Sequence, residues 1–115
     1  MKIKVDTKNS FPYTPDVADN LKQAEKDRWV IFFKRPSWYE QVDNYGKKIS
    51  DNSMNLIKSC FVEMKNPPSL DFGNEQRAAT IDDVFEIPEL SDVATGANIF
   101  LTKLIKNEEY EVKNS

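Results

Sequence analysis

Two stretches of the chain carry the hydrophobic pattern of β-strands. Lys2–Asp6 alternates polar and apolar residues, which predicts a short half-buried strand. Arg28–Arg35 is rich in β-branched and aromatic residues and stops at Pro36, so it is the strongest strand signal in the sequence. Side chains of a strand alternate between its faces. One face then carries Trp29, Ile31 and Phe33, and the other carries Val30 and Phe32. We expect the two strands to pair.

Apolar residues recur at helical spacing in four later segments. The predicted helices span 36–46, 53–65, 81–87 and 88–105. Trp38, Val42 and Tyr45 lie on one side of the first helix, and Thr80 is the N-cap of the third. Gly96, inside the last helix, is expected to weaken it by roughly 1 kcal/mol relative to alanine.

The segments between these elements have fewer apolar residues. Asn9–Asp16 holds two prolines and predicts an extended arm. Residues 17–27 predict one or two weak helical turns or an exposed loop. Residues 66–79 predict a long polar loop anchored by Leu70 and Phe72.

Together these elements predict an α+β fold. A small antiparallel β element, made of the N-terminal strand and the strand at 28–35, is packed by three to four helices. The length of 115 residues fits one domain spanning 1–115, with a frayed charged tail at 107–115.

The composition restricts the chemistry. The chain has no histidine and one cysteine, Cys60. Histidine-based catalytic triads, histidine-containing zinc sites and thiolate clusters are therefore excluded within one chain. Three scattered glycines provide no phosphate-binding loop. We expect a protein that is not an enzyme and that uses no cofactor and no metal.

Charge and hydropathy address the partners and the compartment. The net charge of −3 disfavours binding to nucleic acid and to anionic membranes. The longest apolar stretch, Trp29–Phe33, is too short to span a membrane, and Lys2 and Lys4 after Met1 predict no signal peptide. With a single cysteine, this pattern favours a reducing, cytoplasmic setting.

Four side chains offer candidate chemistry. Asp82 and Glu86 are four residues apart beside Asp83, so they could share a divalent cation. Acidic residues in a first helical turn more often complement the helix dipole, and we favour that interpretation. Cys60 lies beside an apolar helical stripe, which favours a packed core side chain over a nucleophile.

One basic and aromatic segment is a candidate for contact with single-stranded nucleic acid. Arg28, Lys34 and Arg35 alternate there with aromatic residues. Because the whole chain is acidic, we favour a core strand with basic ends. A protein interface through Val30 and Phe32 is a third interpretation, since aromatic residues and arginine are enriched at interfaces.

We predict a protein-binding surface made of apolar residues from the strand at 28–35 and from the helices. Its candidate residues are Trp29, Val30, Phe32, Trp38, Leu90, Val93, Phe100, Leu101 and Leu104. The predicted partner is another protein, and a homo-oligomer is a second expectation.

The order of these elements resembles that of the small tail-assembly chaperones of long-tailed bacteriophages. The similar parts are the arm with Tyr13-Thr14-Pro15, the strand Val30–Pro36, the segment Leu70–Gly73, and the ending Thr80–Leu90 before an amphipathic helix. The sequence departs from the family at Phe61-Val62-Glu63, where a tryptophan is often seen after the middle helix.

The resemblance implies a mostly helical α+β protein that coats the tape-measure protein during tail assembly. It also implies binding through apolar helical surfaces, self-association, and no catalytic residues or cofactor. Two other functions stay open. One is a stable structural or adaptor protein of a phage tail or connector, and the other is a small inhibitor whose acidic surface mimics nucleic acid.

Overall fold

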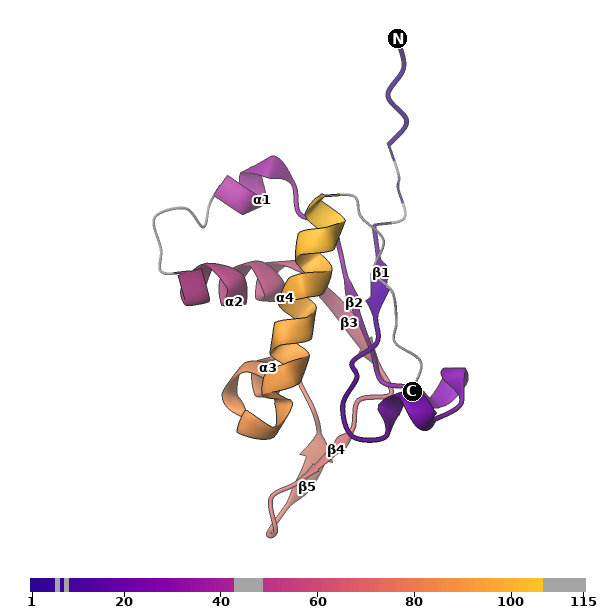
Figure 1. Cartoon of the computed structure of the whole chain (residues 1–115), viewed down its shortest axis with the longest axis vertical. Helices are drawn as coiled ribbons and strands as arrows, with labels where there is room; N and C mark the ends of the chain where they lie inside the picture. Colours follow the sequence, from indigo (N-terminus) through magenta and orange to yellow (C-terminus); the bar gives the residue numbers. More distant parts are fainter. Residues whose placement is uncertain (6, 8, 43–48, 107–115) are drawn as a thin grey trace.

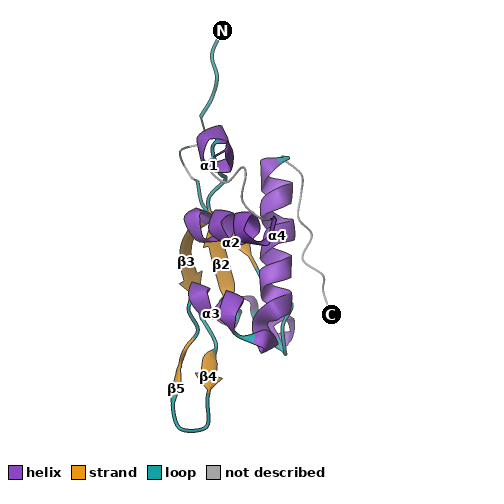
Figure 2. Ribbon diagram, turned by 90° about the vertical axis from the view of Figure 1, so that its left-hand side faces the viewer, coloured by secondary structure: helices purple, strands orange, loops and turns teal. Residues whose placement is uncertain are grey.

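The computed structural model describes residues 1–5, 7, 9–42 and 49–106, and its fold is α+β, as predicted. The main sheet is antiparallel and has the strand order β1 (Phe11–Tyr13), β2 (Val30–Phe33), β3 (Phe61–Lys65). Helix α4 (Ser91–Ile105) crosses in front of the sheet, and α2 (Ile49–Cys60) leads directly into β3 (Figure 1). The turned view shows α4 on one side of the sheet (Figure 2).

The remaining elements surround this sheet. They are α1 (Trp38–Val42), α3 (Ile81–Glu86), the 3-10 turns η1 (Asn20–Lys22), η2 (Glu25–Asp27) and η3 (Pro88–Leu90), and the antiparallel pair β4 (Ser69–Asp71) and β5 (Gln76–Ala78). The β4–β5 hairpin extends away from the body of the molecule (Figure 1).

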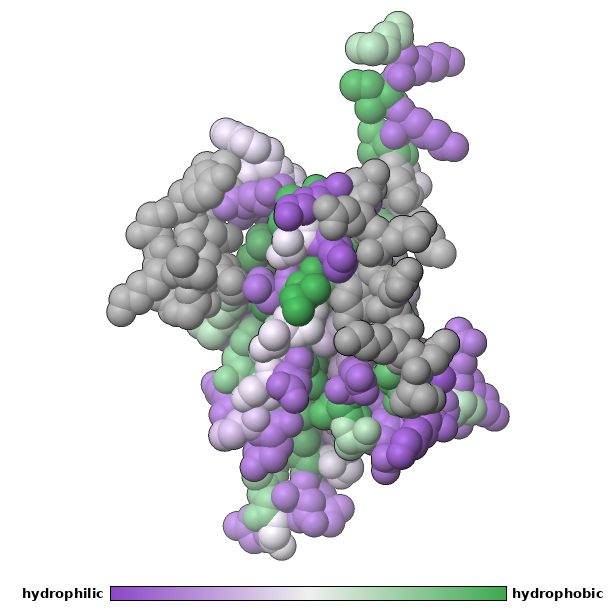
Figure 3. Space-filling model, in the orientation of Figure 1, coloured by the Kyte–Doolittle hydropathy of each residue, from purple (hydrophilic) through white to green (hydrophobic). Residues whose placement is uncertain are grey.

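The first strand of the sheet is Phe11–Tyr13, so the prediction of a strand at Lys2–Asp6 is wrong. Ile3 and Val5 are 79% and 75% exposed, and Asp6 lies outside the described residues. Figure 3 shows the first residues extending away from the body. The larger aromatic rings of β1 bury more apolar surface than Ile3 and Val5 can. Pro12 is tolerated because β1 is an edge strand.

The prediction of a helix at 53–65 extends too far at its C-terminal end. Helix α2 ends at Cys60, and Phe61–Lys65, predicted as helix, is the strand β3. The pairing of β2 with β3 is interrupted between Phe32 and Phe33, where Phe32 faces Glu63 and Phe33 faces Phe61. This bulge contains one extra residue in β3.

The predicted loop at 66–79 is also wrong, because it contains the β4–β5 hairpin. Leu70 packs against the core as expected. Phe72 does not anchor the segment: it is 45% exposed, and the Arg77 guanidinium lies over its ring at 5.1 Å from the centroid.

Of the predicted helix at 36–46, Trp38–Val42 is helical, and residues 43–46 lie outside the described residues.

The core lies between the sheet and the helices, and it confirms the predicted alternation of β2. Trp29, Ile31 and Phe33 are buried, whereas Val30 and Phe32 on the opposite face are half-buried. Helix α4 contributes Val93, Ala97, Phe100, Leu101 and Leu104 to this core. The rings of Tyr13, Phe33 and Phe100 form a cluster with centroids 5.5 to 6.3 Å apart.

Gly96 brings α4 close to β1. The Tyr13 hydroxyl donates a hydrogen bond to the carbonyl of Val93 at 3.1 Å, and the Tyr13 side chain is buried. A Cβ atom added at Gly96 would collide with this hydroxyl. The glycine is therefore required for close packing of a strand against a helix.

Helix α3 begins at the predicted N-cap, Thr80. The Thr80 hydroxyl accepts from the Asp83 backbone N–H, and the Asp83 carboxylate accepts from the Thr80 backbone N–H at 2.8 Å, which makes a capping box. Arg77 donates to both oxygens of Asp83 at 2.6 and 2.7 Å. The Arg77 guanidinium, together with the Thr80 hydrogen bonds, holds the pKa of Asp83 well below its ordinary value. Asp82 pairs with Lys58 at 3.1 Å.

The lowered pKa of Asp83 makes the free energy of unfolding depend on pH in the acid range. Because the pKa of Asp83 is lowered in the folded state, its contribution is fully present above the ordinary pKa of about 4 and is lost as pH falls toward the folded value. We expect Asp83→Asn to be less stable than wild type at pH 7 and to lose less free energy of unfolding between pH 5 and pH 2. Denaturant titrations at each pH measure both quantities. Asp82→Asn is the control, and an equal acid dependence of Asp83→Asn and wild type would contradict this expectation.

Candidate protein-binding site

Most of the predicted protein-binding residues lie inside the molecule. The residues Trp29, Leu90, Val93, Phe100, Leu101 and Leu104 are all buried. The prediction that they form a free surface is therefore wrong, because the chain uses the apolar face of α4 to cover its own sheet. Figure 3 shows mixed hydrophilic and hydrophobic side chains over α4 instead of a continuous apolar face.

The other three predicted residues are accessible and lie on two different elements. Val30 and Phe32 lie half-buried on the outer face of the sheet, opposite Lys65 and Glu63 of β3. Trp38 lies on α1 and is 76% exposed.

The basic side chains of the candidate nucleic-acid patch contact other groups of the same chain. Lys34 pairs with Glu40 at 2.9 Å; this hydrogen-bonded pair raises the pKa of Lys34 and lowers that of Glu40. Arg28 donates to the carbonyls of Leu21 and Gln23 at 2.9 and 3.0 Å. The Arg35 guanidinium lies 5.3 Å from the centroid of a phenylalanine ring in β1. These contacts agree with the preferred interpretation, a strand with basic ends.

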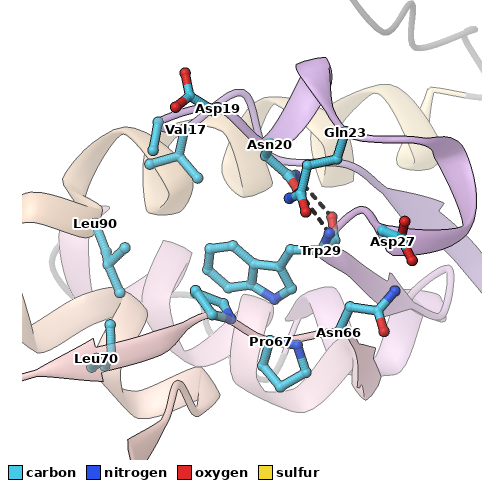
Figure 4. A pocket seen from close by; sticks show the side chains of 12 residues that line it. Val17, Asp19, Asn20, Gln23, Asp27, Trp29, Asn66, Pro67, Leu70 and Leu90 are labelled. Atoms are coloured by element: carbon cyan, nitrogen blue, oxygen red, sulfur yellow. Dashed lines mark hydrogen bonds between the residues drawn. The ribbon is translucent and has the colours of Figure 1, made fainter. Parts of the chain in front are cut away.

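A pocket of about 430 Å³ lies beside Trp29, which forms part of its wall (Figure 4). This volume is within the range of ordinary ligand sites. The apolar part of its wall comes from Val17, Ala18, Trp29, Pro67, Pro68, Leu70 and Leu90, and the polar part from Asp19, Asn20, Gln23, Asp27 and Asn66. Two of the predicted residues, Trp29 and Leu90, are therefore brought together here by segments distant in sequence.

Asn20 fixes one side of the pocket. Its amide donates to the carbonyls of Pro15 and Trp29 at 2.8 and 3.0 Å, and its Oδ1 accepts from the Trp29 backbone N–H at 2.8 Å. Asn20 is itself buried, so every one of these bonds is shielded from water. The turn η1 is thereby attached to the start of β2.

Asn66 fixes the opposite side. Its backbone has a φ of 53°, in the left-handed region that asparagine tolerates better than most residues. Its side-chain amide donates to the carbonyls of Lys26 and Arg28 at 2.8 and 3.1 Å. The end of β3 is thereby held against η2, and Pro67 is placed in the wall of the pocket.

The indole of Trp29 carries an unused donor. Its Nε1 atom is buried and has no hydrogen-bond acceptor among the described residues. Figure 4 shows the indole nitrogen on the side of Pro67 and Asn66. A buried donor without an acceptor costs about 1–3 kcal/mol.

No known protein family, curated protein sequence or solved structure matches this chain. The pocket is therefore interpreted from its own geometry.

Other chemistry is limited in the described part of the chain. There, no three histidine, cysteine or acidic side chains gather to hold a metal ion, and no helix is long and apolar enough to cross a membrane. Cys60 is buried in the core, which confirms its predicted packing role. Burial raises the pKa of the Cys60 thiol to about 11, so it stays protonated at neutral pH.

Several residues that line the pocket are not among the predicted site residues. Asn20 lies in a segment with only weak helical signals, and its role depends on carbonyls up to nine residues away. In the sequence, the dipeptide Pro67-Pro68 indicates only the end of a helix. One signal was available: two prolines after an asparagine mark a rigid turn, and rigid turns commonly form the walls of binding sites.

Proposed function

We propose that the protein is a non-enzymatic assembly factor that binds an apolar segment of a partner protein, in the manner of a phage tail-assembly chaperone. The observation that carries this proposal is the apolar pocket at Trp29. An apolar side chain of a protein segment is the kind of group that would fill this pocket.

The rim of the pocket favours a basic neighbour in that segment. Asp19 and Asp27 are exposed and contribute two carboxylates to the lining. Asp19 forms only a long, exposed pair with Lys22 at 3.6 Å, and such pairs contribute little. A lysine or arginine next to the apolar residue of the partner would gain attraction from the nearer of these two carboxylates. The expected ligand is thus an apolar residue followed or preceded by a basic one.

The phage setting of this proposal comes from the resemblance in element order. The described fold is compatible with it, since the ending with a capped helix, Pro88 and an amphipathic α4 is present. We therefore take the tape-measure protein encoded by the same genome as the proposed partner.

Leu70→Asp tests the pocket. Leu70 is half-buried in the pocket wall, so a carboxylate there places a charge where the apolar side chain of the partner would bind. Coexpression with the tape-measure protein is expected to keep that protein soluble with the wild type. Because Leu70 also packs against the core, denaturant titration first checks that Leu70→Asp is folded. With the folded variant, binding of the tape-measure protein is expected to weaken at least tenfold, roughly 1.4 kcal/mol or more, with loss of the soluble complex.

Ile99→Asp is the matched control, because Ile99 is 48% exposed on α4 and does not line the pocket. It is expected to support the tape-measure protein as well as the wild type does. Equal solubility with and without the wild-type chain, or full activity of Leu70→Asp, would refute the proposal. Mass spectrometry of purified virions separates a chaperone, which is absent from the finished particle, from a structural tail protein, which is retained.

A further inference from the structure

The strand β3 is an exposed edge of the main sheet. It pairs with β2 along one side, and within the described residues no strand pairs with its other side. Val62 is 45% exposed, and Glu63 and Lys65 are exposed as well. An edge strand with unpaired backbone groups is a template for a further strand.

The side chains of this edge carry a self-complementary charge pattern. Glu63 and Lys65 are opposite Phe32 and Val30 of β2, so both lie on the outer face of the sheet. Neither forms an ion pair with another described residue. If a second β3 is aligned antiparallel with Met64 facing Met64, Glu63 of each strand faces Lys65 of the other. Opposite charges at facing positions stabilise an antiparallel pair.

We propose that two copies of this chain associate through β3 in this register. The two three-stranded sheets then become one continuous sheet with a two-fold axis at Met64. Val30 and Phe32 of both copies lie on the same outer face of that sheet, on either side of the charged pairs. The left-handed backbone of Asn66, followed by Pro67, ends the strand and limits the pairing to β3.

The charges also favour the register with Met64 facing Met64 over the register with Glu63 facing Glu63. Alignment of Glu63 with Glu63 of the second copy would place two carboxylates opposite each other, and like charges at facing positions are destabilising. Alignment about Met64 replaces that repulsion with two attractive pairs. A second copy of the chain is thus the occupant whose charges complement this edge.

Charge exchange tests the register. Glu63→Lys gives a strand with lysine at both positions, and Lys65→Glu gives one with glutamate at both. Each variant alone is expected to lose at least about tenfold in dimer association. An equimolar mixture of the two variants should form a heterodimer, because each lysine then faces a glutamate. The double variant Glu63→Lys/Lys65→Glu should again form a homodimer.

Sedimentation equilibrium at low salt measures these states, and the wild-type dimer is expected to weaken as salt is added. Denaturant titration checks that each variant is folded. The proposal is overturned if the wild type is monomeric at all concentrations, if either single variant dimerises like the wild type, or if the mixture stays monomeric. These residues do not line the Trp29 pocket, so a failure here leaves the proposed function intact, and the reverse also holds.

Discussion

Gly96→Ala is expected to destabilise the protein by about 2–4 kcal/mol, although alanine is the better helix former. The added Cβ would overlap the hydroxyl of Tyr13, which is buried and hydrogen-bonded to the Val93 carbonyl. Overpacking in a core and the loss of a buried hydrogen bond each cost about 1–3 kcal/mol. The gain in helix propensity is about 1 kcal/mol, so packing determines the sign of the change.

Denaturant unfolding followed by circular dichroism measures this loss. Thr95→Ala, at an exposed position of the same helix, controls for helix propensity and should change stability by less than about 0.5 kcal/mol. Gly96→Ala combined with Tyr13→Phe should recover part of the loss, because the colliding hydroxyl is removed. If Gly96→Ala were more stable than the wild type, β1 would not pack against α4 as described.

Asn20→Ala is expected to cost about 2–4 kcal/mol, because it leaves several buried backbone groups without partners. The Pro15 carbonyl loses its donor at 2.8 Å, and the Trp29 N–H and carbonyl lose partners at 2.8 and 3.0 Å. The same substitution detaches η1 from β2, so the pocket beside Trp29 should open as well.

Thermal and denaturant unfolding test this expectation, with Gln23→Ala as the control. Gln23 is exposed and donates to Asn20 at 3.3 Å, so its removal should cost only a few tenths of a kcal/mol. Trp29 fluorescence in a Trp38→Phe background reports the state of the pocket, since Trp38 is the other tryptophan and is exposed. A loss below about 0.5 kcal/mol for Asn20→Ala would show that these bonds contribute little.

Local patterns predicted the elements whose periodicity is unambiguous. The alternation of β2, the Thr80 cap and the apolar face of α4 all depend on residues a few positions apart, and all three are present in the structure. The structure adds what α4 packs against: its apolar face covers the sheet of the same chain, so it is not free for a partner.

β3 shows why a pattern can fail. Phe61 and Met64 are three residues apart, a spacing that indicates one face of a helix. In a regular strand they would point to opposite faces. The extra residue at the bulge brings both to the core side, opposite Phe33 and Ile31, so a bulged strand imitates helical spacing.

The choice of the first strand could not be made locally. Lys2–Asp6 has the better alternation, but Tyr13 fits the space beside Gly96, eighty-three residues later in the chain. The pocket depends in the same way on pairs distant in sequence, such as Asn66 with the carbonyls of Lys26 and Arg28. The predicted binding residues are apolar, and an apolar pattern alone does not distinguish a free surface from the core. Most of these residues are buried in the core.

The direct passage from α2 to β3 has a consequence for how this chain can evolve. No residue separates Cys60 from Phe61. An insertion or deletion between Ile57 and Phe61 would therefore either rotate the buried face of α2 relative to β3 or move the outer residues of β3 into the core. Length changes should accumulate instead at the tip of the β4–β5 hairpin, where Gly73 has a φ of 89° and open space around it. In natural relatives, the α2–β3 junction should vary in residue type and keep its length.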